Sequence, residues 1–274
     1  MFISSRDNPR IKRYIKLSAN RKSRYQEGLF VIEGARVCRD AFEQWQNGKL
    51  NITSCFATHK AVEKYTDYID PEWFNKYEQF CFISDDVAQK MSDSEYPQGI
   101  FAEAEMIKTG FEISDDKTDG KYLILDDLQD PGNVGTLLRT AEAVGIDAVF
   151  MCGCCDLYNP KVIRSAMGTV FRMNIIYSMN FLQVIEVLRK NQITVFASVI
   201  DDDAESIINA DFGGKSAMVL GNEGSGLSQN DIMLCDKKVT ISMRGNTNSL
   251  NVASAGAILL WEMCKGGQKK WIIV

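Results

Sequence analysis

The sequence predicts an α/β protein with a small N-terminal α/β domain and a C-terminal α/β domain built on a mostly parallel sheet. The length of 274 residues suits two domains, since domains average about 150 residues. Beyond the midpoint, apolar runs of strand length alternate with segments of helical period, which is typical of a parallel sheet covered by helices. A polar, turn-rich stretch separates the halves. We therefore expect domains at 1–105 and 121–274, joined by a linker at 106–120.

Composition excludes several classes of protein. With 45% hydrophobic and 24% charged residues the chain is neither fibrous nor wholly disordered. It has no apolar run near the ~20 residues of a membrane span and no apolar leader, so we expect a soluble, cytoplasmic protein. The single histidine, His59, rules out multi-histidine metal sites within one chain and is interpreted as a surface residue. The cluster Cys152-Gly153-Cys154-Cys155 is interpreted as a buried strand end with reduced thiols, and no metal is expected.

The N-terminal segment is strongly basic. The whole chain carries −5, yet residues 1–24 carry +7, which leaves −12 for the remainder. Ile11, Tyr14, Ile15 and Leu17 fall on one side of a predicted helix, so the cations are expected to face water. A plain solvated helix face is one interpretation, and an arm that binds a polyanion is the other. The candidate RNA-binding residues of this arm are Arg6, Arg10, Lys12, Arg13, Arg21, Lys22 and Arg24.

The remaining elements follow from short apolar runs. After the arm, a strand is predicted from Leu29 to Ile32, then a break at Gly34 and a helix. Parallel sheets bind ligands beyond the carboxyl ends of their strands, so the segments that follow each C-terminal strand are the places to search. Those strands are predicted at 122–126, 148–152, 193–199, 216–221 and 238–243.

Three segments that follow predicted strands carry unusual residues. In 126–145, a Pro131-Gly132 turn leads to a helix that begins near Asn133, and Arg139 follows about two turns later. We expect Asn133 in the loop or at the helix cap, where its amide binds backbone or ligand. A helix cap followed by an ordinary surface arginine is the alternative for this segment.

The second segment, 219–228, holds three glycines around Glu223 and matches neither the dinucleotide nor the phosphate-loop pattern. It predicts a backbone that approaches a ligand closely, with one carboxylate inside the loop. In the third, 241–263, a polar turn leads to a helix that opens near Ser249. The first half of that helix has small side chains, which predicts close packing against another element or subunit.

These segments, in this order, resemble the motifs of the SpoU-type RNA ribose 2′-O-methyltransferases of the SPOUT superfamily. The resemblance rests on NVGTLLRTAEAVG (133–145), LGNEGSGLS (220–228) and ISMRGNTNSLNVASAGAILLWE (241–262), supported by NPKVIRSAMGTVF (159–171). The front of the chain, 4–37, resembles the RNA-binding domain of that family, which has a ribosomal-protein L30e-like fold. The resemblance implies a deep trefoil knot in the C-terminal domain, S-adenosylmethionine as cofactor and a homodimer formed through that domain.

The resemblance also implies roles for individual residues. Arg139 would accept the ribose proton with help from an RNA phosphate, or would hold that phosphate and stabilise the developing alkoxide, since a guanidinium is a poor base. Ser242 and Asn248 depart from residues found in some members and bear on substrate detail. The implied catalytic group is Asn133, Arg139, Glu223, Ser249 and Asn251, and the implied cofactor-binding group is Gly221, Ile241, Met243 and Leu250.

The substrate implied by the resemblance is RNA, with ribosomal RNA favoured over transfer RNA because of the separate N-terminal domain. One alternative function is a non-catalytic RNA-binding protein that retains the fold. Another is a Rossmann-type methyltransferase of proteins or small molecules, which needs a glycine-rich loop after the first strand. The richest glycine loop here comes late, at 221–226.

Overall fold

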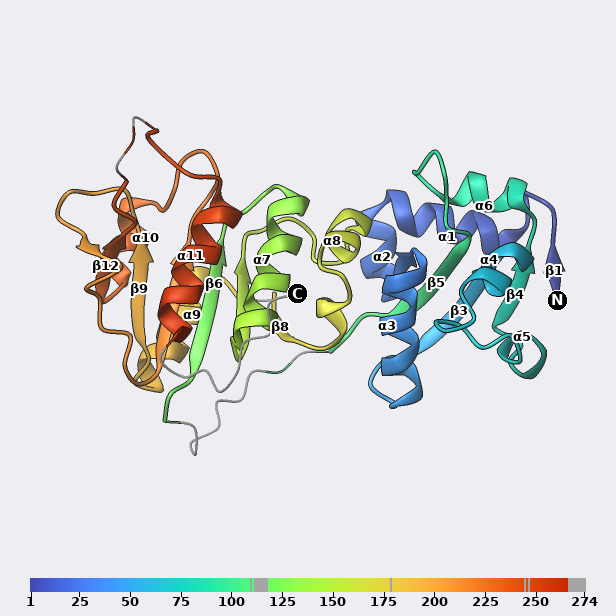
Figure 1. The fold of residues 1–274 in the computed structure, drawn as a ribbon, viewed down its shortest axis with the longest axis horizontal. Coiled ribbons are helices and arrows are strands. Elements are labelled where there is room, and N and C mark those ends of the chain that lie inside the picture. Colours follow the sequence, from blue (N-terminus) through green and yellow to red (C-terminus); the bar gives the residue numbers. More distant parts are fainter. Residues whose placement is uncertain (109, 111–117, 178, 244, 246, 266–274) are drawn as a thin grey trace. The chain divides into compact units, whose positions relative to one another are not determined.

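The chain folds as two compact units in a computed structural model, which describes residues 1–108, 110, 118–177, 179–243, 245 and 247–265 (Figure 1). Unit 1 comprises Met1–Lys108 and Asp156–Arg172, and unit 2 comprises Thr109–Cys155 and Met173–Val274. This division differs from the predicted domain boundaries, because the units meet at Lys108 and Thr109 and unit 1 takes in a second segment. Residues 156–172, which we expected inside the C-terminal domain, pack with the N-terminal unit. Most of the predicted linker lies outside the described residues.

Unit 1 is built around a five-stranded sheet of spatial order β1-β4-β3-β5-β2. Strand β5 runs antiparallel to β2 and β3, whereas β3, β4 and β1 are parallel to one another. The strands are β1 (Phe2–Ile3), β2 (Leu29–Glu33), β3 (Ile52–Ala57), β4 (Phe80–Ile83) and β5 (Ile100–Glu105). The helices are α1 (Pro9–Ala19), α2 (Arg21–Glu27), α3 (Ala35–Gln46), α4 (His59–Lys64), α5 (Trp73–Lys76), α6 (Asp85–Met91), α8 (Pro160–Ser165) and the short 3₁₀ helix η1 (Thr169–Phe171).

The basic N-terminal segment forms α1 and α2. Asn8 caps α1 through its side chain and Pro9 occupies the first turn, where a missing N–H costs nothing. Ile11, Tyr14 and Leu17 are buried in the core of the unit, which confirms the apolar side predicted for this helix. These three apolar residues, spaced three positions apart, fix the helix on the sheet, and α1 is therefore part of the core rather than a detached arm.

The expectation that all cations of this segment face water is wrong for Arg24, which is 3% exposed. Its Nε donates to Asp156 Oδ2 at 3.0 Å, and its Nη1 donates to the carbonyls of Leu17 and Ser18. A buried guanidinium needs such partners because an unpaired charge in the interior is costly. Arg24 therefore has a structural place in unit 1.

Residues 156–172 cover strand β2, which lies at the edge of the sheet. Phe30 of that strand packs on the ring of Tyr158, with 4.7 Å between centroids. Ion pairs hold the segment along its length, because Arg164 reaches Glu33 at 2.9 Å and Arg172 reaches Asp40 at 3.1 Å. Covering an exposed edge strand is a common protection against unwanted strand pairing. The segment thus completes the core of unit 1.

Unit 2 contains a seven-stranded sheet of order β10-β12-β9-β11-β6-β7-β8, in which every recorded pair is parallel. This confirms the mostly parallel sheet. The strands are β6 (Lys121–Asp126), β7 (Ala148–Cys152), β8 (Asn174–Ile176), β9 (Thr194–Ser198), β10 (Glu205–Ser206), β11 (Ser216–Leu220) and β12 (Lys237–Thr240). The helices are α7 (Pro131–Val144), α9 (Phe181–Lys190), α10 (Gln229–Leu234) and α11 (Val252–Cys264).

Helix α11 packs against α7 and β11, as its small residues predict. A Cβ built on Gly256 would lie 2.3 Å from Leu137 Cδ2 of α7 and 2.8 Å from Leu220 Cδ1 of β11. Only glycine therefore permits this approach. The apolar face of α9 packs in a separate core cluster with side chains of the same sheet. Figure 1 shows α7 and α11 together on one side of that sheet.

The described residues contain no helix long and apolar enough to cross a membrane. In the same residues no group of three or more histidines, cysteines and carboxylates is arranged to hold a metal. Cys152 is buried at the end of β7, whereas Cys154 and Cys155 are half-buried, and all eight cysteines are free thiols. His59 is exposed at the start of α4 and stacks on Phe82, as a surface residue.

Candidate active site

Three segments of unit 2 meet through one chain of hydrogen bonds beyond the strand ends. Glu223, in the loop after β11, accepts at Oε1 from the Asn133 side-chain amide at 3.2 Å. Asn133 Oδ1 in turn accepts from Asn251 Nδ2 at 3.0 Å. Because parallel strands end at one edge of a sheet, residues 90 and 118 positions apart in the sequence become neighbours here. The structure thus brings together three of the five predicted catalytic residues.

The local fold around Asn133 differs from our expectation. Asn133 lies in the first turn of α7, and the cap is Asp130, whose Oδ1 accepts from the Asn133 N–H at 2.8 Å. Pro131 occupies the first helical position, where it is favoured. Since Asp130 already satisfies the backbone, the Asn133 side chain is free to bridge Glu223 and Asn251.

Asn251, unlike Asn133, is a helix cap, and it caps the helix of the third segment. Its Oδ1 accepts from the N–H groups of Ala253 and Ser254, so it caps α11, which begins at Val252 rather than near Ser249. Ser249 stays in the polar turn before the helix and is exposed. The Asn251 side chain therefore has both roles at once, with its oxygen at the helix and its amide nitrogen at Asn133.

The Glu223 carboxylate is held as an anion. It also accepts from the backbone N–H groups of Gln129 at 3.1 Å and Asp130 at 3.0 Å. Partial burial works against the charge, but these backbone hydrogen bonds and the one from Asn133 outweigh it and lower the pKa of Glu223. Glu223 is therefore an acceptor that fixes the start of α7 and orients Asn133, and it is poorly suited to donate a proton near neutral pH.

A cavity of about 410 Å³ opens beside this network. All four positions predicted to hold the cofactor line it: Gly221, Ile241, Met243 and Leu250. Glu223 and Ser249 line it too, whereas Asn133, Asn251 and Arg139 do not. Sequence reasoning missed a further wall of the cavity, which consists of the end of β9 with the two residues after it (198–200) and part of α10. Residues 198–200 could have been found from the sequence, because 193–199 was a predicted strand and parallel sheets bind ligands beyond the carboxyl ends of their strands.

Gly221 shapes the cavity through a close backbone contact. A Cβ on Gly221 would lie 2.6 Å from the carbonyl carbon of Gly226 and from the nitrogen of Leu227. The loop folds back on itself through a hydrogen bond from the Gly226 N–H to the Asn222 carbonyl at 2.9 Å. Asn222 Nδ2 ties the loop to the Asp127 carbonyl at 2.8 Å. A side chain at Gly221 would break this arrangement.

Arg139 stands apart from both the network and the cavity. It is exposed on α7, six residues after Asn133, and so lies on a different side of the helix. Among the described residues it has no hydrogen-bond or ion-pair partner. Its guanidinium is therefore available to a ligand from solution, and its catalytic role stays a prediction.

Another carboxylate at the end of a strand, Asp126, has a pKa that is raised rather than lowered. Burial, together with the charges of Asp231 and Asp127, raises the pKa of Asp126 to about 6. Asp126 ends β6 and does not line the cavity. The raised pKa of Asp126 therefore belongs to the carboxyl end of the sheet and does not concern the wall of the cavity.

The predicted RNA-binding cations of unit 1 fall into three environments. Arg10 donates to the Gln79 carbonyl at 3.1 Å, and Arg13 pairs with the fully buried Glu103, so both turn toward the sheet. Arg24 is buried, as described. The exposed members are Arg6 and Lys12, which pair with carboxylates, and Arg21 and Lys22, which have no carboxylate partner among the described residues.

Comparison with known protein families gives two matches that cover most of the chain. Residues 120–261 match the model of the SpoU rRNA Methylase family, and residues 8–102 match the MRM3-like substrate binding domain. The first match alone spans more than half of the 274 residues. The two matches lie on either side of the segment 103–119.

Individual proteins are similar over nearly their full length. The chain is 29% identical to the 23S rRNA (guanosine(2553)-2′-O)-methyltransferase RlmP of Bacillus subtilis (strain 168), over 95% of this chain and 98% of that protein. A solved RNA 2′-O ribose methyltransferase is 29% identical, with a TM-score of 0.78 and coverage of 97% and 98%. The AdoMet-bound rRNA methyltransferase from Sinorhizobium meliloti has the same fold, with a TM-score of 0.85 at 23% identity and coverage of 98% and 99%.

Proposed function

The chain belongs to the SpoU rRNA methylase family, and from this membership we propose that it methylates a ribose 2′-hydroxyl of ribosomal RNA with S-adenosylmethionine as donor. The observation that carries the proposal is the meeting of the Glu223, Asn133 and Asn251 network with the neighbouring cavity. Ribosomal RNA is favoured over transfer RNA because the B. subtilis relative is a 23S rRNA enzyme and the N-terminal half matches a substrate binding domain.

The cavity fits the cofactor in size and chemistry. Its volume of about 410 Å³ lies within the ~300–1,000 Å³ of small-molecule sites. Apolar side chains such as Leu250 and Ile241 suit an adenine ring, and the loop from Gly221 brings backbone groups close to a ligand. S-adenosylmethionine, when bound, supplies an electrophilic methyl group. The roles of Gly221, Ile241, Met243 and Leu250 in holding it are part of this proposal.

The residues of this chain supply orientation and charge. A ribose hydroxyl is a weak nucleophile until its proton leaves, so a group that binds the nearby phosphate and stabilises the oxyanion lowers the barrier. We assign this part to Arg139, because a guanidinium presents its N–H donors in a fork that matches a phosphate. Asn133 and Asn251, held by Glu223, orient the ribose, and Ser249 at the cavity rim contacts the substrate.

We further propose a homodimer formed through unit 2. Ile258 and Trp261 lie three positions apart on one side of α11, which is a mostly apolar helix. They are nevertheless 44% and 45% exposed. Exposed apolar groups grouped on one helix are typical of an interface. A cytoplasmic location is part of the proposal as well, since all eight cysteines are free thiols.

Methyl transfer to RNA tests the proposal directly. The protein is incubated with labelled S-adenosylmethionine and ribosomal RNA, and the label is followed into 2′-O-methylated nucleotides. We expect Arg139→Ala to abolish transfer while cofactor binding, measured by calorimetry, survives. Lys190→Ala, which removes an exposed charge at the end of α9, is the matched control and keeps activity. Turnover by the Arg139 variant near the wild-type rate would contradict the assignment, and RNA binding by the wild type without any transfer would favour the non-catalytic alternative.

A further inference from the structure

Unit 1 contains a groove that takes no part in the site described above. It has a volume of about 510 Å³ and lies between α4, α6 and the loop 92–99 that leads into β5. This volume is within the range of sites that hold small organic groups, ~300–1,000 Å³. Its rim carries two lysines, Lys60 and Lys64, and two tyrosines, Tyr65 and Tyr96. The groove therefore combines positive charge with flat aromatic surface.

Tyr96 is the unusual residue of this groove, because this large aromatic residue is 81% exposed. The loop that carries it is nevertheless ordered by its own hydrogen bonds. The Tyr96 N–H donates to Ser94 Oγ at 3.3 Å, and the Ser94 N–H donates to Ser92 Oγ at 2.9 Å. Gln89 Nε2 of α6 donates to the Ser94 carbonyl at 3.2 Å. An aromatic ring is thus presented to solvent on a fixed backbone.

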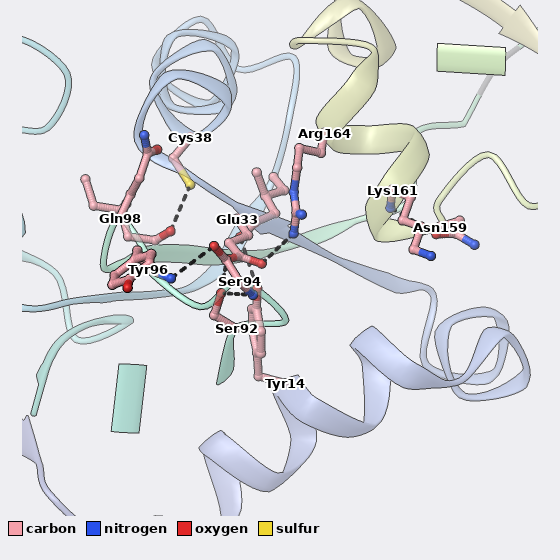
Figure 2. Close-up of polar contacts among 12 residues, drawn as sticks. Tyr14, Glu33, Cys38, Ser92, Ser94, Tyr96, Gln98, Asn159, Lys161 and Arg164 are labelled. Atoms are coloured by element: carbon pink, nitrogen blue, oxygen red, sulfur yellow. Dashed lines mark hydrogen bonds and ion pairs between the residues drawn. The ribbon is translucent and has the colours of Figure 1, made fainter. Parts of the chain in front are cut away.

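Both ends of this loop are anchored to the rest of unit 1. At the first end, the Ser92 hydroxyl donates to the Glu33 carboxylate, which also pairs with Arg164 at 2.9 Å (Figure 2). Near the other end, Gln98 Oε1 accepts from the Ala35 N–H at 2.7 Å. A Cβ on Gly99, which has a φ of +75°, would lie only 2.8 Å from Thr58 Oγ1. These contacts fix both ends of the loop that forms one side of the groove.

The lysines at the rim are available to an anion. Lys60 Nζ pairs with Asp85 Oδ2 at 2.6 Å, but the two side chains are 82% and 62% exposed. Such surface pairs contribute little to stability, so an incoming phosphate can replace the carboxylate. Lys64 Nζ lies 5.1 Å from the centroid of the Tyr65 ring and makes no ion pair among the described residues. Positive charge next to stacking rings is the arrangement with which proteins hold single-stranded nucleic acid.

We propose that this groove binds an unpaired nucleotide of the RNA substrate, with its base stacked on Tyr96 and its phosphate at Lys60 and Lys64. The inference rests on the proposed function, which makes RNA the partner, and adds the place and the kind of RNA element. Proteins recognise RNA mostly at loops and bulges, where bases are unstacked and can lie against aromatic side chains. A fully paired helix cannot offer a base to Tyr96.

Direct RNA binding and methylation kinetics test the inference. The variants are Tyr96→Leu, which keeps an apolar side chain without the ring, and Tyr96→Phe, which keeps the ring. From the usual strength of a base–aromatic stack, we expect Tyr96→Leu to weaken binding of a 23S rRNA transcript about 10-fold. It should raise the KM for RNA with little change in kcat or in cofactor affinity. Tyr96→Phe should bind as the wild type does, and thermal unfolding checks that both variants are folded.

A second set of measurements tests the phosphate contact and distinguishes failure of the groove proposal from failure of the proposed function. Lys64→Ala should lessen the salt dependence of RNA affinity, whereas Lys49→Ala, an exposed lysine after α3, should not. A fully paired RNA duplex should bind wild type and Tyr96→Leu equally. If Tyr96→Leu has unchanged affinity and KM for rRNA, the proposal that the groove binds a nucleotide is wrong. Methyl transfer by the wild type would still support the proposed function in that case. Loss of transfer in the wild type, with the Tyr96 effect on binding intact, would overturn only the function.

Discussion

The buried ion pair between Arg24 and Asp156 predicts that unit 1 depends on residues from the second half of the chain. The two side chains are only 4% and 5% exposed. In Asp156→Ala, Arg24 keeps its two carbonyl acceptors on Nη1 but loses both bonds to the carboxylate. The Tyr25 hydroxyl and the Tyr158 N–H lose an acceptor as well. Removing one partner of a buried pair costs about 3–5 kcal/mol, so we expect a loss of that order.

Urea unfolding followed by fluorescence measures this loss, since two of the four tryptophans, Trp45 and Trp73, lie in unit 1. The transition of unit 1 should move to markedly lower urea, while cofactor binding in unit 2 is retained. Asp7→Ala, which removes the partner of Lys12 in a highly exposed pair, is the control and should leave the midpoint unchanged. The double variant Arg24→Met with Asp156→Leu should recover much of the loss. A midpoint for Asp156→Ala equal to that of the wild type would refute the reasoning.

Three further predictions concern unit 2. Gly256→Val should destabilise the protein by about 1–3 kcal/mol in thermal unfolding, because its side chain would overlap Leu137, whereas Ser254→Ala on the exposed side should not. Asp126→Asn should raise the free energy of unfolding at pH 8 but not at pH 3. Between pH 3.8 and about 6 the folded state keeps a proton on Asp126 that the unfolded state loses, so the stability of the wild type falls as the pH rises through that window. The asparagine variant has no such group to titrate. Equal urea midpoints for wild type and Asp126→Asn at pH 8 would contradict this. Ile258→Asp should convert the proposed dimer to a monomer in light scattering, and an unchanged mass would remove α11 from the interface.

Much of unit 2 could be predicted from the sequence because its signals are local. The apolar runs at 122–126 and 148–152 became β6 and β7 with shifts of one residue or none. Parallel strands place their carboxyl ends together, so the meeting of Asn133, Glu223 and Asn251 followed from three strand ends and a family resemblance. The cap of α7 was missed although its signal was present, since Asp130 before Pro131 is a stronger start than Asn133.

The place of residues 156–172 could not be predicted because nothing local encodes it. Arg24 and Asp156 are 132 positions apart, and each has the appearance of an ordinary surface charge in its own segment. Buried ion pairs of this kind are visible only once the chain has folded. The apolar residues of the segment, such as Tyr158, fit the core of either unit equally well by composition.

The charge of the N-terminal segment also changes meaning in the folded protein. A net of +7 over residues 1–24 suggests a strong field toward RNA, but Arg24 is buried and Arg13 is paired with Glu103. Deleting the segment would therefore remove α1 from the core and would not measure electrostatics. The informative change is Arg21→Gln with Lys22→Gln, which removes two exposed cations. The slope of the logarithm of RNA affinity against the logarithm of salt concentration should then decrease in magnitude by about 1.4–1.8. An unchanged slope would mean that these two side chains do not contact RNA phosphates.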